Sequence, residues 1–115
     1  MARRPPTLTG KQRSHLRALA HALKPIVQIG QKGLTAGVTQ ELSAALETHE
    51  LVKVKLDSDR AREAEELLIA LERDAECHVV QHIGRTFVVY RMRERDPTIV
   101  LPARRRPRAG RSGED

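Results

Sequence analysis

Ile26-Val27-Gln28-Ile29-Gly30-Gln31-Lys32-Gly33-Leu34-Thr35 is the stretch that decides the fold. Residues 25–29 are mostly apolar and predict a short strand. A helix is predicted from about residue 35 to 48, because Thr35 can cap it and apolar residues recur at helical spacing behind it. Between the two lies a Gly-x-x-Gly turn, and glycine can take a positive φ and let backbone approach a ligand closely. The stretch therefore predicts a strand, a glycine loop and a helix in direct succession.

The loop of residues 30–33 has the features of a phosphate-binding turn. A helix start just behind it offers unpaired N–H groups and a positive dipole end to an anion. Lys32 adds a mobile cation at one of the two variable positions. In the KH class of RNA-binding domains the same kind of loop grips a nucleic-acid backbone. Two glycines three residues apart also occur in ordinary turns, so the loop alone leaves both interpretations open.

The other elements are predicted by the same kinds of pattern. Thr9 can cap a helix of about fourteen residues that Pro25 ends. Residues 51–56 alternate as a strand whose polar side presents Lys53 and Lys55. A third helix is predicted over about residues 60–75, with a mainly acidic outer face. Residues 77–83 and 86–91 then form a hairpin around a tight turn at residues 84–85.

This order, α-β-α-β-α-β-β, predicts an α/β fold with a four-stranded mixed sheet. We expect a two-layer sandwich with the helices against one face, so that Lys53 and Lys55 look outward from the other. Residues 1–8 are predicted to be a disordered basic arm, residues 9–101 one domain, and residues 102–115 a flexible Arg-rich tail. Residues 99–101 are expected to add a short edge strand or to pack on the core.

The charge of the chain favours a polyanionic partner. The 115 residues include 21 Lys and Arg against 15 Asp and Glu, a formal charge of +6. The excess lies in residues 1–24, which contain no acid, and in residues 103–115, whereas the middle is slightly acidic. Two basic ends around a near-neutral core are typical of a protein that binds nucleic acid. Solubility, or nonspecific adhesion to RNA, is the alternative explanation.

Aromatic content limits how such a partner could be bound. The chain has one Phe, one Tyr and no Trp, so it can hardly supply a platform of aromatic rings on which bases stack. Phe87 is expected in the core, and the position of Tyr90 stays open. Binding should therefore rest on backbone, charge and shape.

No catalytic, metal or cofactor site is predicted. The five histidines show no metal-ligand spacing, and His78 and His82 would lie on one strand face about 13 Å apart. The single Cys77 excludes an internal disulfide, fits a reducing cytoplasm and is expected to be a buried structural thiol. No apolar run is long enough to span a membrane, and the N-terminus is not a secretory signal. We expect a cytoplasmic monomer without a small-molecule substrate.

Several spaced blocks of the chain resemble the CRM domain (chloroplast RNA splicing and ribosome maturation), in its single-domain bacterial, YhbY-like form. The resemblance covers about residues 8–101. Its blocks are Leu16-Arg17-Ala18-Leu19-Ala20-His21, Leu23-Lys24-Pro25, Ile29-Gly30-Gln31-Lys32-Gly33-Leu34-Thr35, His49-Glu50-Leu51-Val52-Lys53-Val54-Lys55, Ile83-Gly84-Arg85-Thr86 and Val89-Tyr90-Arg91.

The resemblance implies a fold similar to the C-terminal domain of bacterial translation initiation factor three. It also implies RNA binding associated with precursors of the large ribosomal subunit. Carried over by position, the implied RNA-binding residues are Gly30, Gln31, Lys32 and Gly33 in the loop, with Arg17, Lys24, Lys53, Lys55 and Arg85 around it. The Arg-rich tail after Pro102 departs from the family.

Two other functions are compatible with the sequence. The acidic third helix could instead make the chain an interaction module that recruits a ribosome-assembly factor. Nonspecific binding to DNA is a third possibility.

Overall fold

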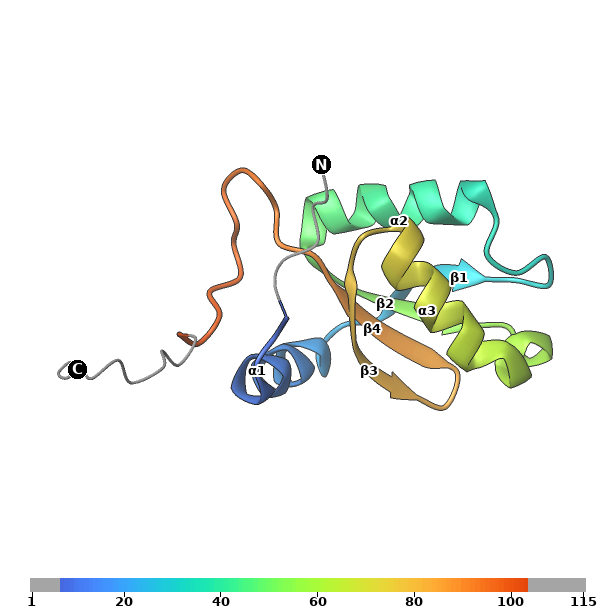
Figure 1. Ribbon diagram of the computed structural model, residues 1–115, viewed down its shortest axis with the longest axis horizontal. Coiled ribbons are helices and arrows are strands. Elements are labelled where there is room, and N and C mark those ends of the chain that lie inside the picture. Colours follow the sequence, from blue (N-terminus) through green and yellow to red (C-terminus); the bar gives the residue numbers. More distant parts are fainter. Residues whose placement is uncertain (1–6, 104–115) are drawn as a thin grey trace, which may run out of the picture.

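Residues 7–103 are described by the computed structural model, which is an α/β fold around a four-stranded mixed sheet (Figure 1). The sheet order is β1-β2-β4-β3; β1 runs parallel to β2, and the other two pairs are antiparallel. In chain order the elements are α1 (Gly10–Ala20), β1 (Pro25–Ile29), α2 (Ala36–His49), β2 (Leu51–Leu56), a 3₁₀ helix (Ser58–Glu63), α3 (Ala64–Asp74), β3 (His78–Ile83) and β4 (Thr86–Tyr90). The fold class and the mixed four-stranded sheet are confirmed.

Helices α2 and α3 cover one face of the sheet and form the larger core with it. Leu42 and Leu46 of α2 and Leu71 of α3 are fully buried there, against Val54 of β2 and Phe87 of β4. Phe87 is therefore a core residue, as expected. The free Cys77 is buried in the same core, and its thiol donates to the carbonyl of the α3 residue Leu71.

Helix α1 lies on the opposite face of the sheet, which differs from the expectation that the helices share one face (Figure 1). Its buried residues Leu16 and Ala20 pack on Leu51, Val88 and Tyr90. We call this side of the sheet the α1 face. Because side chains alternate along a strand, it is also the face of Lys53 and Lys55.

The ends of the helices follow local hydrogen bonding. The Thr9 hydroxyl accepts the N–H of Gln12, and the Gln12 side chain accepts the N–H of Thr9, which completes a capping box. Thr35 caps α2 through the N–H of Val38. Helix α1 ends at Ala20, earlier than expected. Helix α3 begins later than expected, because residues 58–63 form a 3₁₀ turn that Asp57 caps.

A β-bulge in β3 corrects the prediction for the histidines of that strand. The register shifts between Val79 and Gln81, so that His78 pairs with Tyr90 on the α1 face. His82 pairs with Phe87 on the other face and contacts its ring edge-on. The expectation that His78 and His82 share a face is therefore wrong, because the bulge inserts a residue between them.

The segment after β4 is held by the carboxylate of Glu50, which lies between α2 and β2. Glu50 is fully buried and has a positive φ of 65°. Its carboxylate accepts the N–H groups of Arg93, Thr98 and Ile99, at 2.8–2.9 Å, and the hydroxyl of Thr98. Ile99 and Leu101 pack in consequence against the α1 side of the core. Residues 99–101 thus pack on the core and add no strand.

Arg91 makes a second long-range link beside Glu50. Its guanidinium is buried and donates to the carbonyl of Ala75 at 2.8 Å, to the carbonyl and hydroxyl of Ser43, and to the carboxylate of Glu47. These bonds join the end of β4 to α2 and to the end of α3. The buried Arg91 side chain therefore stabilises the fold.

At each end of residues 7–103, one residue that the sequence placed outside the domain contacts it. Leu8, assigned to the basic arm, is buried beside α1. The Gln12 amide donates to the carbonyl of Pro102. The rest of the arm, residues 1–6, and residues 104–115 of the tail lie outside the described part of the chain.

We predict that Glu50→Gln destabilises the domain and changes its response to acid. Burial raises the pKa of Glu50, but the N–H groups of Arg93, Ile99 and Thr98 and the Thr98 hydroxyl lower it by more, so the pKa lies below its ordinary 4.5. The unfolded chain then binds the proton more readily. The stability that the ionised Glu50 carboxylate contributes is therefore complete above pH 4.5. It is lost as the pH falls through the lower pKa that Glu50 has in the folded chain. An amide cannot accept all four bonds, so the loss at pH 7 should be about 2–3 kcal/mol.

Urea unfolding between pH 3 and pH 7 measures both effects. The exposed Glu41→Gln on α2 is the matched control and should leave the acid dependence as in the parent. A Glu50→Gln chain that loses stability in acid as steeply as the parent would contradict the assignment.

Candidate nucleic-acid interface

The loop of residues 30–33 is a tight turn between β1 and α2. The N–H of Gly33 donates to the carbonyl of Gly30 at 3.0 Å, and Gly33 has a φ of 76°. That conformation favours glycine, because a Cβ is strained at positive φ. Gly33 is buried, whereas Gln31 and Lys32 at the tip are exposed. The strand, loop and helix predicted from this stretch are confirmed.

Gly30 has a different role from Gly33. Its φ lies outside the left-handed region, and a Cβ built on it would meet no atom within 4 Å. The fold therefore does not require glycine at this position. The missing side chain leaves the backbone of the loop open from outside, next to the N-terminus of α2, where an anion is favoured.

An acidic side chain lies beside this loop, which the sequence did not indicate. The amide of Gln31 donates to the carboxylate of Asp59 in the 3₁₀ turn, at 3.3 Å. Both side chains are exposed. The Gln31 side chain is thus hydrogen-bonded to the 3₁₀ turn. Lys32 is the cation at the loop tip.

One end of the sheet brings the loop together with Arg85. The N–H of Asp57 donates to the carbonyl of Ile29, and the N–H of Leu56 donates to the carbonyl of Arg85 at 2.7 Å. The strand registers place the same residues side by side, because Lys55 pairs with Gln28 of β1 and with Thr86 of β4. We call this the loop end of the sheet; Figure 1 shows the loop after β1 and the β3–β4 turn at the same end.

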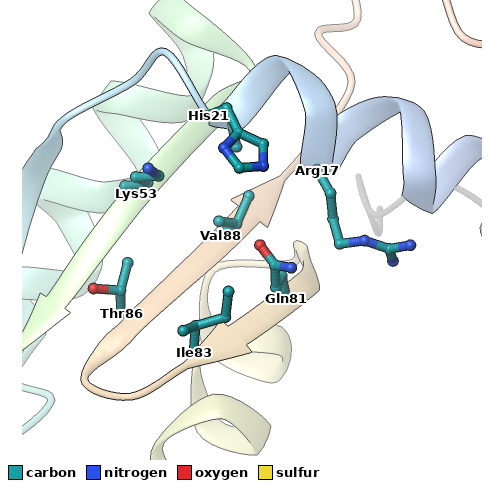
Figure 2. A pocket seen from close by; sticks show the side chains of 8 residues that line it. Arg17, His21, Lys53, Gln81, Ile83, Thr86 and Val88 are labelled. Carbon is teal, nitrogen blue, oxygen red and sulfur yellow. The ribbon is translucent and has the colours of Figure 1, made fainter.

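The remaining basic residues extend from the loop end along the α1 face. Lys24 and Lys55 line one shallow hollow at the β1 edge, together with the acidic Glu41 of α2. Lys24 and Lys53 line a second. Lys53 and Arg17 line a third, between α1 and the β3–β4 hairpin (Figure 2). Arg17 is at its rim: the guanidinium points away from the hollow and donates to the hydroxyl of Ser14. The sequence-predicted residues thus form a connected surface, not a single cluster.

Helix α1 leaves that surface open near the loop. It packs over Leu51, Val80, Val88 and Tyr90, whereas Lys55, close to the loop end, is exposed. Tyr90, which the sequence left open, is buried, and burial and the Glu50 charge raise its pKa to about 12. It offers no ring to a base.

Other side chains of the surface were not predicted as site residues. Gln81, Thr86 and His21 line the hollow of Figure 2 together with Lys53. Thr86 could have been indicated as the one polar residue of the strand of residues 86–90 beside the predicted turn, but the bulge hides the direction of Gln81. Among residues 7–103 no three His, Cys, Asp or Glu side chains are grouped to hold a metal ion. No helix in that range is long and apolar enough to cross a membrane.

Comparison with known proteins identifies the family. The model of the CRS1/YhbY (CRM) domain matches residues 8–91. The chain belongs to the CRM domain family. A Haemophilus influenzae protein named RNA-binding protein is 44% identical over 97 residues, which cover 84% of this chain and 96% of that protein. A Bacillus subtilis protein named Probable RNA-binding protein YqeI is 36% identical over 95 residues, 83% of this chain and 99% of that one.

A solved structure has the same fold. The solution structure of a Staphylococcus aureus protein matches with a TM-score of 0.72 at 36% identity, over 84% of this chain and all of that one. The CRM match ends at Arg91, whereas the segment held by Glu50 continues to residues 93–99. The packed domain therefore extends beyond the residues that the family model matches.

We predict that alanine at the two loop glycines of this CRM domain changes the free energy of unfolding to different extents. Gly33→Ala should lower the free energy of unfolding by about 1–2 kcal/mol, because a side chain is strained in the left-handed region. Gly30→Ala should change it by less than about 0.5 kcal/mol, because nothing surrounds the added Cβ. Urea unfolding of the two variants measures the difference. Equal losses would show that residue 30 also needs glycine for folding.

Proposed function

We propose that this CRM domain binds RNA by gripping its backbone with the loop of residues 30–33. The observation that carries the proposal is the open backbone at Gly30, beside the exposed Lys32 and the N-terminus of α2. Lys55 and Arg85 add positive charge at the same end of the sheet, and Lys24, Lys53 and Arg17 continue it along the α1 face. Relatives named as RNA-binding proteins support the same conclusion.

The role of this binding, in our proposal, is non-catalytic assistance in assembly of the large ribosomal subunit. The domain would act as a cytoplasmic monomer on ribosomal RNA of subunit precursors. Support comes from the family resemblance and from a single basic domain with a buried thiol. Crosslinking in cells followed by sequencing of the attached RNA tests this role: precursor large-subunit RNA should dominate, and messenger or transfer RNA in its place would overturn it.

Lys32→Asp is the sharpest test of the loop. Reversing one charge at a phosphate contact should weaken binding to single-stranded RNA at least about tenfold. The melting temperature should stay the same, because Lys32 is exposed at the loop tip. Lys11→Asp, an equal charge change at an exposed position of α1 outside the three hollows, is the matched control.

Salt dependence gives a second readout of the same contact. With four to six phosphates bound, log K should fall with log salt at a slope of about −3 to −4. Lys32→Asp should make that slope shallower by about 0.7, the share of one phosphate on a single strand. An unchanged affinity and slope would rule out the loop as the clamp. Competition by duplex DNA as effective as by RNA would instead indicate a nonspecific polyanion binder.

The alternative function, recruitment of an assembly factor through α3, is favoured by one observation. Ile69 of α3 is 60% exposed, on a helix whose first turn carries Glu65 and Glu66. Lys32→Asp separates the two proposals. The first expects lost RNA affinity, whereas the second expects an unchanged association with preribosomal particles and its loss on Ile69→Asp.

A further inference from the structure

The hollow between α1 and the β3–β4 hairpin is a small pocket with both apolar and polar side chains in its lining (Figure 2). Its apolar lining is formed by Ala20, Val88 and the exposed Ile83, and its polar groups are His21, Lys53, Gln81 and Thr86. Among residues 7–103 no acidic side chain lines it. The volume is about 210 Å³. Clefts for drug-sized ligands have about 300–1,000 Å³, so this pocket fits something smaller.

The polar groups of the pocket are available to a ligand. Within the described chain, the side chains of His21, Gln81 and Thr86 make no hydrogen bond that would occupy them. The Gln81 amide both donates and accepts, as does the Thr86 hydroxyl, and these are the functions that read the edge of a base. In Figure 2, Gln81, Thr86 and the ring of His21 surround Val88.

The ring of His21 supplies a flat surface that Phe87 and Tyr90 cannot offer to this pocket. Phe87 and Tyr90 are both fully buried, so neither can stack on a base. His21 is exposed at the end of α1, and a histidine ring is one of the flat surfaces on which unpaired RNA bases stack. Lys53 lines the same pocket and provides a cation for a phosphate group.

We propose that this pocket holds one unpaired nucleotide of the bound RNA. Its base stacks on His21 and hydrogen-bonds Gln81 and Thr86, while Lys53 faces its phosphate. This inference rests on the proposed function, since the loop grips the backbone of the same strand. Lys55 pairs with Thr86, which lines the pocket at the loop end, so a strand held by the loop passes Lys55 before it reaches Lys53. RNA with an unpaired segment would then be preferred over a blunt duplex, whose bases are not available.

The first test uses nucleotides in place of RNA, so that it does not depend on the loop. The four 5′-ribonucleoside monophosphates and inorganic phosphate are titrated into the ¹⁵N-labelled full chain and followed by NMR. At least one nucleotide should shift the side-chain amide of Gln81 and the backbone amide of Thr86, with a dissociation constant in the millimolar range. Inorganic phosphate should leave the Gln81 amide in place. Shifts produced equally by phosphate, or none up to about 20 mM nucleotide, would overturn the proposal.

The second test compares variants on RNA. His21→Ala and Gln81→Ala should each weaken binding to a single-stranded oligonucleotide by about five- to tenfold, the lower range for loss of one stacked or hydrogen-bonded base. Binding to a blunt RNA duplex and the salt slope should not change, because neither side chain contacts a phosphate. The matched controls are His15→Ala on α1 and Gln40→Ala on α2, which lie outside the pocket. A variant that weakens duplex and single strand equally contradicts a base pocket.

The outcomes distinguish this proposal from the clamp. If the parent chain binds RNA and Lys32→Asp abolishes binding, but the nucleotides leave Gln81 unshifted, the clamp stands and the pocket fails. If the nucleotides bind but Lys32→Asp has no effect on RNA, the pocket stands and the clamp fails.

Discussion

The buried carboxylate of Glu50 is the interaction on which the other parts of the α1 face depend. A buried charge is costly unless hydrogen bonds satisfy it, and here three backbone N–H groups and a hydroxyl do so. All four come from the chain after β4, which has no regular secondary structure among the described residues. This irregular segment is therefore held in place by a side chain whose own backbone links α2 to β2.

The segment held by Glu50 also affects α1, because it packs against the same cluster of side chains. The segment fixed by Glu50 places Ile99 and Leu101 against the cluster that also contains Leu16 and Tyr90. Helix α1 thus packs in the same cluster as this segment and is also hydrogen-bonded to it, through the Gln12 amide and the Pro102 carbonyl. Since the pocket of Figure 2 lies between α1 and the β3–β4 hairpin, its shape depends on an interaction at the opposite end of β2.

Local features of the fold could be predicted from the sequence, and long-range ones could not. The caps at Thr9 and Thr35, the loop of residues 30–33 and the strand Leu51–Leu56 depend on neighbours within a few residues, and they were predicted correctly. The face that α1 covers depends on pairing across the sheet. A signal for it was present: Phe87-Val88-Val89-Tyr90 is apolar without alternation, which is typical of a strand buried on both faces.

Part of the candidate site was predicted for the same local reason, whereas Arg17, Lys24 and Arg85 were implied by the family resemblance alone. The part that was not predicted has a physical cause. The loop and the lysines of β2 follow from composition and alternation. Gln81 faces the pocket only because a bulge shifts the register within β3, and sequence periodicity cannot show a bulge. Aromatic counting also overlooked His21, whose ring is exposed because it lies at the end of α1. The polar side chains of the candidate site are therefore those that packing leaves exposed or half-buried, whereas the polar groups of Glu50 and Arg91 are buried and hydrogen-bonded within the fold. Exposure, more than residue type, separates the two sets.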